Sequence, residues 1–119
     1  HALTNQPVTV YKDHFRTSTY LDDTCRTLCN IVDNFKPGEI YNIGGLEYHD
    51  IETLVNMIWD YVGADKKLIT YKESEVLTTK SKKVDISKAV KDLDHHLTIK
   101  LEDGVKKTID WMRGYYGIK

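Results

Sequence analysis

The stretches of this chain that could form β-strands are few and short, and no hairpin turn joins any two of them. The candidates are Val8–Tyr11, Thr17–Leu21, Glu39–Ile43 and Leu68–Tyr71, which are rich in β-branched and aromatic residues. Strands this short and this scattered hardly form an independent sheet. We therefore expect an α/β arrangement whose elements dock on a larger sheet that the chain does not contain.

Four segments have the spacing of amphipathic helices. The clearest runs from Ile51 to Val62, with Asp50 placed to cap its start and Gly63 to end it. A second follows the candidate cap residues Asp22, Asp23 and Thr24. A short third is expected from Asp85 to about Leu93, and a fourth at about 101–115. Gly104 in the last helix costs roughly 1 kcal/mol against Ala, which a close packing partner would explain. The sequence predicts about four helices and a few short strands.

Length and charge exclude several classes of protein. The chain has 119 residues, which is one domain or part of one, and it begins with His1, so we expect a processed start or a fragment. Its 17 basic and 18 acidic residues give a net charge of −1, which argues against a nucleic-acid partner. No apolar run approaches the roughly 18 residues that span a membrane, and no secretory signal is visible. We expect a soluble, cytoplasmic protein without a membrane partner.

Two cysteines, Cys25 and Cys29, are too few for a disulfide scaffold and lack further ligands for zinc. They lie one turn apart on the apolar face of the second predicted helix, which also carries Leu28, Val32 and Phe35. We expect this face, with both cysteines reduced, to be part of the core.

No motif of catalysis or cofactor binding is apparent. The nucleophile elbow, the P-loop, the zinc-protease motif and the dinucleotide fingerprint are all absent. Gly44 and Gly45 are expected to form a turn after a strand. The adjacent pair His95–His96 is expected in an exposed loop, and the isolated His14 and His49 have no evident partner that would make them bases. We therefore assign no catalytic residue and no metal ligand.

The basic residues give the clearest indication of a ligand. Arg16 stands between two candidate strands, where its guanidinium fits a pair of phosphates. The alternative is a surface ion pair with a neighbouring aspartate, worth about 0–1 kcal/mol. Lys80, Lys82 and Lys83 lie in a polar loop at 73–83, which is either a solvated run or a site for an anionic ligand.

Four motifs, in order along the chain, resemble the C-terminal part of extended short-chain dehydrogenase/reductases, the NAD-dependent nucleotide-sugar epimerases and dehydratases. They are VTVYKDHFRTSTYLDD at 8–23, GEIYNIGG at 38–45, VDISK at 84–88 and LEDGVKKTIDW at 101–111. The resemblance runs from about Pro7 to Trp111. It implies that residues 1–119 are a substrate-binding subdomain, in the α/β class, that lacks its Rossmann sheet.

The resemblance also implies a parent enzyme whose N-terminal Rossmann domain binds NAD or NADP and carries a Tyr-x-x-x-Lys catalytic pair. We expect neither in this chain, so it should hold no cofactor and be inactive alone. Arg16 matches the family arginine that contacts the substrate diphosphate, and Lys80 and Lys82 fall at basic positions near the phosphates. Asp50 falls at a polar cap that can lie near the nucleotide, although capping is the alternative. The implied partners are a nucleotide sugar and the missing Rossmann domain.

A second hypothesis is a free-standing interaction or regulatory module that shares ancestry with these enzymes. Its contact surface would come from the apolar helix faces together with Trp59, Trp111, Tyr115 and Tyr116. If the chain is severed from a Rossmann partner, it should expose an apolar face that self-associates. We therefore expect a homo-oligomer.

Overall fold

The computed structural model describes residues 1–34, 36–74 and 77–118. The described part contains four α-helices, four short strands and two single turns of 3₁₀-helix. In chain order they are η1 (Ala2–Thr4), β1 (Val8–Tyr11), β2 (Phe15–Thr17), α1 (Leu21–Asn34), β3 (Tyr48–Asp50), α2 (Ile51–Val62), η2 (Lys66–Leu68), β4 (Ile69–Lys72), α3 (Ser87–Leu93) and α4 (Leu101–Tyr116). The predicted fold class of about four helices with a few short strands is confirmed.

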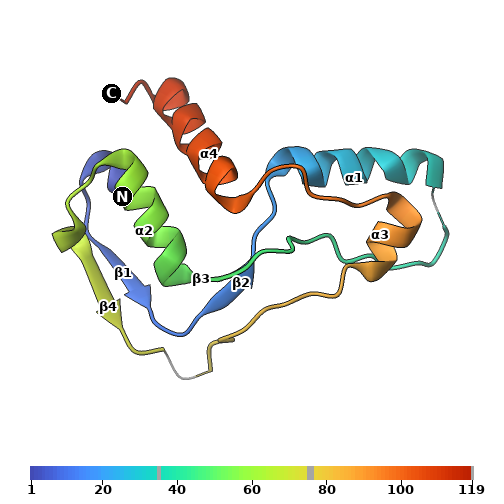
Figure 1. Cartoon of the computed structure of the whole chain (residues 1–119), viewed down its shortest axis with the longest axis horizontal. Coiled ribbons are helices and arrows are strands. Elements are labelled where there is room, and N and C mark those ends of the chain that lie inside the picture. Colours follow the sequence, from blue (N-terminus) through green and yellow to red (C-terminus); the bar gives the residue numbers. More distant parts are fainter. Residues whose placement is uncertain (35, 75–76, 119) are drawn as a thin grey trace.

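The strands form two separate pairs, and neither is a sheet that could stand alone. β1 and β4 are parallel, with Val8 opposite Ile69. β2 and β3 are antiparallel, with Arg16 opposite His49 (Figure 1). The second strand thus lies at 15–17 rather than at the expected 17–21, because β3 pairs with these residues.

One end of the molecule has a small hydrophobic core between α2 and the β1–β4 pair. Val55 and Trp59 of α2 pack with Val10 and Ile69 of the strands and with Ala2 of η1. The predicted helix at 51–62 is confirmed with both of its ends. Asp50 accepts a hydrogen bond from the Thr53 backbone N–H, and Gly63 takes the left-handed conformation at φ 76° and donates to the Trp59 carbonyl.

The other end is built from α1, α3 and the segment before α4. Asp23 is fully buried, and its carboxylate accepts hydrogen bonds from the backbone N–H groups of Thr98 and Ile99 at 3.1–3.2 Å. It also forms an ion pair with Arg26 at 3.0 Å. The residues expected to cap this helix therefore do not stand before it: α1 begins at Leu21, and Asp23 holds a distant segment in place instead.

Helix α1 buries its polar side rather than its apolar one. Asp23 and Thr27 are fully buried, and the Asn30 amide donates to the Leu93 carbonyl at 2.9 Å. The apolar side that was expected in the core is exposed: Leu28 is 50% and Val32 80% accessible, and both cysteines are exposed. Phe35 lies outside the described residues. The expectation was wrong because α3 and the following loop bind the polar side of α1, and the described chain offers nothing to cover the other.

The predicted strand at 39–43 is also absent, although its residues alternate as strand residues do. Ile40 is 83% exposed, and no described segment pairs with this stretch. The polar contacts of Tyr41 and Lys88 fix it to α3 instead: the Tyr41 hydroxyl donates to Asp92 at 3.0 Å, and Lys88 pairs with Glu39. A strand needs a neighbouring strand, and none is available at this position.

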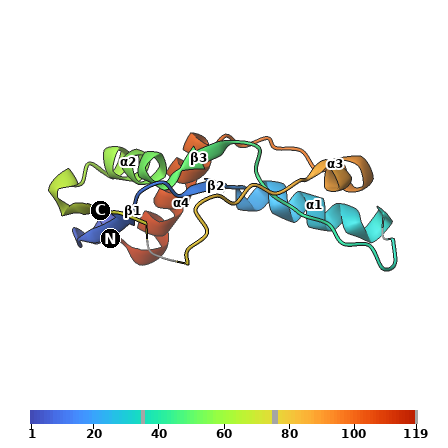
Figure 2. The same cartoon turned by 90° about the horizontal axis from the view of Figure 1, so that it is seen from below.

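The molecule is flat and open (Figures 1 and 2). Its extents are 49 × 38 × 19 Å, and its radius of gyration is 16.8 Å, against about 13.5 Å for a compact domain of this length. Figure 1 shows long extended segments that connect α1 and α3 with the end formed by α2, β1 and β4. None of the helices in the described part has both the length and the apolar character that crossing a membrane requires.

Candidate functional site

Arg16 lies at the middle of β2, where the loop that carries the lysines returns to it. The guanidinium of Arg16 donates to the carbonyl oxygens of Phe15 at 2.6 Å and Lys80 at 3.2 Å. The backbones are joined as well: the Phe15 N–H donates to the Lys80 carbonyl at 2.6 Å, and the Lys82 N–H to the Phe15 carbonyl at 3.1 Å. Residues 80–82 are therefore joined to β2 by an isolated parallel bridge, in which Ser81 lies opposite Phe15. Residues 75 and 76 of the predicted loop lie outside the described residues.

The register of the three segments sorts their side chains onto two faces. Phe15 is opposite Ser81 on one side and Asp50 on the other, and Thr17 is opposite Tyr48. Phe15 and Ser81 share a face at the bridge, and because side chains alternate along each segment we infer that Arg16, Lys80 and Lys82 share the other face. Three of the four predicted binding residues thus come together, which we call the cationic face. Asp50 belongs to the opposite face.

The charges of the cationic face have no acidic partner among the residues that the structure describes. Lys80 and Lys82 are exposed, and neither they nor Arg16 forms an ion pair. The alternative, an ion pair between Arg16 and a neighbouring aspartate, is therefore absent among the described residues. A group of like charges without counterions attracts an anion.

Asp50 acts as a helix cap. Its carboxylate accepts from the backbone N–H of Thr53 and, at 3.0 Å, from the Thr53 hydroxyl. This carboxylate satisfies the start of α2, so that helix end offers no open site for a phosphate.

On the opposite face, the side chain of Tyr48 links β2 to the segment 81–83. This residue was not identified from the sequence. Its ring stacks on Phe15 with centroids 5.3 Å apart, its hydroxyl bonds to that of Ser81 at 2.5 Å, and Lys83 lies over the ring at 5.7 Å. The only sequence signal for Tyr48 is an aromatic residue two positions before the Asp50 cap, which does not reveal these distant partners.

Three histidines are buried, and both ring nitrogens of each one form hydrogen bonds within the protein. His14 donates to the Lys12 carbonyl and shares a bond with Thr78, while His49 donates to the Glu47 carbonyl and accepts from Ser18. The expectation for His95 was wrong, because its side chain is only 1% exposed. It donates to the Gly44 carbonyl at 2.8 Å and bonds to the Thr27 hydroxyl at 2.7 Å.

Gly44 and Gly45 permit close crossings rather than a turn. A Cβ atom on Gly45 would stand 1.9 Å from the Ser18 carbonyl oxygen, and one on Gly44 would stand 2.6 Å from Val84 Cγ2. The expected turn is therefore not their role. The close partner expected for Gly104 is found, because a Cβ there would stand 3.1 Å from the Tyr20 ring.

One Tyr-x-x-x-Lys spacing does occur, at Tyr115 and Lys119, contrary to the expectation from the motifs. Gly117 takes the left-handed conformation at φ 64° and ends α4 between the two residues. Lys119 lies outside the described residues. Tyr115 stacks on Trp111 at 5.2 Å. The described residues also contain no group of three or more acidic, histidine or cysteine side chains that could hold a metal ion.

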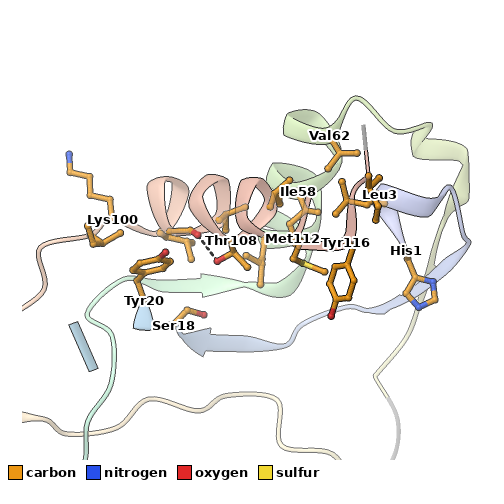
Figure 3. Close-up of a pocket in the computed structure, with 18 of the residues that line it drawn as sticks. His1, Leu3, Ser18, Tyr20, Ile58, Val62, Lys100, Thr108, Met112 and Tyr116 are labelled. Carbon is orange, nitrogen blue, oxygen red and sulfur yellow. Dashed lines mark hydrogen bonds between the residues drawn. The ribbon is translucent and has the colours of Figure 1, made fainter. Parts of the chain in front are cut away.

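An apolar groove of about 610 Å³ lies between η1, α2 and α4 (Figure 3). The residues that line it include Leu3, Tyr20, Ile58 and Met112. None of the predicted binding residues lines it, and an apolar wall does not suit a diphosphate. The groove is thus separate from the cationic face.

Comparison with known proteins finds that the chain is similar to part of several nucleotide-sugar enzymes. No protein-family model matches it. It is 28% identical over 120 residues to dTDP-glucose 4,6-dehydratase of Escherichia coli, covering 93% of this chain and 33% of that protein. It is 29% identical over 115 residues to UDP-glucuronate 4-epimerase of Thermodesulfobacterium geofontis, covering 91% of this chain and 34% of that protein. The chain thus spans about a third of the length of the curated relatives it matches.

Solved structures give the same result. UDP-glucuronic acid 4-epimerase from Bacillus cereus, in complex with UDP-glucuronic acid and NAD, matches with a TM-score of 0.82 and 29% identity over 96% of this chain and 37% of that one. DesIV, a dTDP-glucose 4,6-dehydratase from Streptomyces venezuelae with NAD bound, shares the fold with a TM-score of 0.84 and 24% identity over 98% of this chain and 38% of that one. The sequence relatives and structural neighbours of this chain are therefore enzymes of the extended short-chain dehydrogenase/reductase family, of which it matches one fragment.

Proposed function

We propose that this chain is the C-terminal, substrate-binding part of an NAD-dependent nucleotide-sugar epimerase or dehydratase, and that its cationic face holds the nucleotide diphosphate. The observation that carries the proposal is the placement of Arg16 beside residues 80–82, although 64 residues separate Arg16 from Lys80. Three positive charges on one face, without acidic partners in the described residues, are complementary in sign to a diphosphate.

Within the site the residues have different tasks. Arg16 uses Nη1 for the two carbonyl oxygens, so its remaining N–H groups are available to form a fork on phosphate oxygens. Lys80 and Lys82 add point charges from the neighbouring segment. Asp50 acts by fixing the start of α2, since a carboxylate beside the diphosphate would repel it. Holding the nucleotide in this way positions the sugar for reaction in the other half of the enzyme.

The chemistry is assigned to polypeptide outside this chain. The sequence lacks the dinucleotide fingerprint, so its residues do not fit NAD or NADP, and the nicotinamide that accepts and returns a hydride belongs to the parent enzyme. The exposed apolar side of α1 and the unpaired stretch at 39–43 support a Rossmann domain as the partner that covers them. We further propose that the parent is cytoplasmic and that the isolated chain forms homo-oligomers.

A second candidate function is an interaction module, and one observation favours it. Trp111, Tyr115 and Tyr116 form an exposed cluster on α4, with ring centroids 4.9–6.4 Å apart. These side chains are 58–70% exposed, as a contact surface requires. Trp59, which was expected in the same surface, is instead buried in the core at 4% exposure. A module of this kind has no reason to bind nucleotides.

Calorimetric titration of the chain with UDP, dTDP, GDP and CDP, and with the four matching nucleosides, separates the two functions. We expect at least one diphosphate to bind and its nucleoside to bind far more weakly, because the cationic face recognises phosphate. Equal or absent binding of both forms would contradict the proposal. The chain alone should convert no nucleotide sugar, so measurable epimerisation or dehydration would contradict the division of labour.

A further inference from the structure

We propose that Tyr48 is the positioning residue of the cationic face: it holds the segment 80–83 against β2 so that Lys80 and Lys82 stand beside Arg16. The inference rests on the proposed function and adds to it a residue that contacts no ligand. Tyr48 lies on the face of the three-segment ribbon opposite to the cations, as its register with Thr17 shows.

Each contact of Tyr48 is with a neighbour of a cation. Phe15, on which its ring stacks, precedes Arg16 directly. Ser81, to which its hydroxyl bonds, stands between Lys80 and Lys82. Lys83 follows them and lies over the ring. One side chain therefore reaches both segments that supply the cations.

The backbone alone attaches residues 80–82 weakly. The other links described for this segment are the two backbone hydrogen bonds that form the isolated bridge between Phe15 and Ser81, and the bond from the Arg16 guanidinium. An extended segment with so few partners opens easily. Like charges on Arg16, Lys80 and Lys82 also repel one another when no anion is bound. The hydroxyl contact between Tyr48 and Ser81 opposes this repulsion and keeps the face assembled before the ligand arrives.

The test uses variants that remove the hydroxyl contact and leave the rings. Tyr48→Phe keeps the stack on Phe15 and the contact with Lys83, and Ser81→Ala removes the other hydroxyl. Ser81→Thr retains a hydroxyl and is the conservative rescue. Tyr71→Phe is the matched control, because Tyr71 is exposed at 38% on β4 and no hydrogen bond of its hydroxyl is described.

Two measurements are made on each variant. Trypsin cleaves after Lys80, Lys82 and Lys83, so the rate of cleavage there reports how often the segment opens. We expect Tyr48→Phe and Ser81→Ala to be cleaved about two- to tenfold faster, the range that corresponds to one lost hydrogen bond. The double variant should be no faster than either single variant, because both remove the same contact. Titration with UDP and dTDP should show affinity falling by a similar factor at an unchanged melting temperature.

Three outcomes would contradict these expectations, and they can be told apart. Cleavage of Tyr48→Phe at the rate of the Tyr71→Phe control would overturn the positioning role. The positioning role would also be overturned if the wild-type chain binds UDP or dTDP and the Tyr48→Phe variant binds the same nucleotide equally well. A wild-type chain that binds neither nucleotide would overturn the proposed function and the positioning role with it.

Discussion

The Arg16 guanidinium donates a hydrogen bond to the Lys80 carbonyl oxygen at 3.2 Å, across 64 residues of sequence. This contact places a planar cation of β2 beside the segment that carries Lys80, Lys82 and Lys83. It also means that Arg16 has a structural task in addition to any ligand contact, so its substitution affects both the charge and the position of the lysines.

Replacing Arg16 should weaken binding of a nucleoside diphosphate, more with alanine than with lysine. Arg16→Ala should lower affinity roughly 10- to 100-fold, as the loss of a charge-assisted hydrogen bond of about 1.5–3 kcal/mol predicts. Arg16→Lys should lie between this variant and the wild type, because it keeps the charge and loses the fork. Calorimetry measures the effect. Arg113→Ala is the control, because Arg113 lies on α4, away from the cationic face, and its guanidinium also donates to a backbone carbonyl, that of Val62. Equal affinities of Arg16→Ala and Arg113→Ala would refute the assignment.

Gly45→Ala should destabilise the fold. The new Cβ would stand 1.9 Å from the Ser18 carbonyl oxygen, so backbone must move, at about 1–3 kcal/mol or more. Gly114→Ala is the matched control, because nothing lies within 4 Å of its Cβ and a helical alanine gains about 0.5–1 kcal/mol over glycine. Urea unfolding should therefore move the two midpoints in opposite directions. A Gly45→Ala midpoint equal to that of the wild type would contradict the crossing at Ser18.

Asp23 should make stability fall in acid. Burial raises the pKa of its carboxyl, but the hydrogen bonds from Thr98 and Ile99 outweigh burial, and the pKa lies below its ordinary value of 3.8. A carboxyl with a lowered folded pKa stabilises the fold fully above the unfolded value and loses that effect as pH falls through the folded one. Urea unfolding between about pH 5 and pH 2 should show this loss. Asp23→Asn should be less stable at neutral pH, and its free energy of unfolding should change less across this range. A pH profile of the variant that runs parallel to that of the wild type would exclude the mechanism.

The exposed side of α1 should drive self-association of the isolated chain. Val32→Lys places a charge on a side chain that is 80% accessible, and it should shift the chain toward monomer without loss of stability. Asn34→Lys adds the same charge on the polar flank of the helix and should leave assembly unchanged. Sedimentation velocity decides between them. A wild-type chain that stays monomeric at high concentration would be evidence against the expectation.

Local signals allowed most of the fold to be predicted. The spacing from Ile51 to Val62, the Asp50 cap and the Gly63 end all lie within one helix, so the sequence contains all the information needed. The stretch at 39–43 and the apolar side of α1 were assigned by the same rules, and both were wrong. Their patterns predict burial, but the strand lacks a partner and the helix is attached by Asp23, Thr27 and Asn30.

The candidate site could be predicted only in part, for the same physical reason. Motif position identified Arg16, Lys80 and Lys82, and the strand register places them on one face. Tyr48 and His95 could not be found in this way. Their partners, Ser81 and Gly44, are 33 and 51 residues away, and nothing near either residue in the sequence indicates those contacts.

Backbone chemical-shift mapping of the isotopically labelled chain tests the nucleotide-binding role most directly. Spectra are recorded during titration with UDP and dTDP, with uridine and thymidine as controls. The largest shifts should fall on Arg16 and on residues 80–83 with the diphosphates and be absent with the nucleosides. Shifts confined to the apolar groove, or no difference between the diphosphates and the nucleosides, would contradict the role proposed for the cationic face.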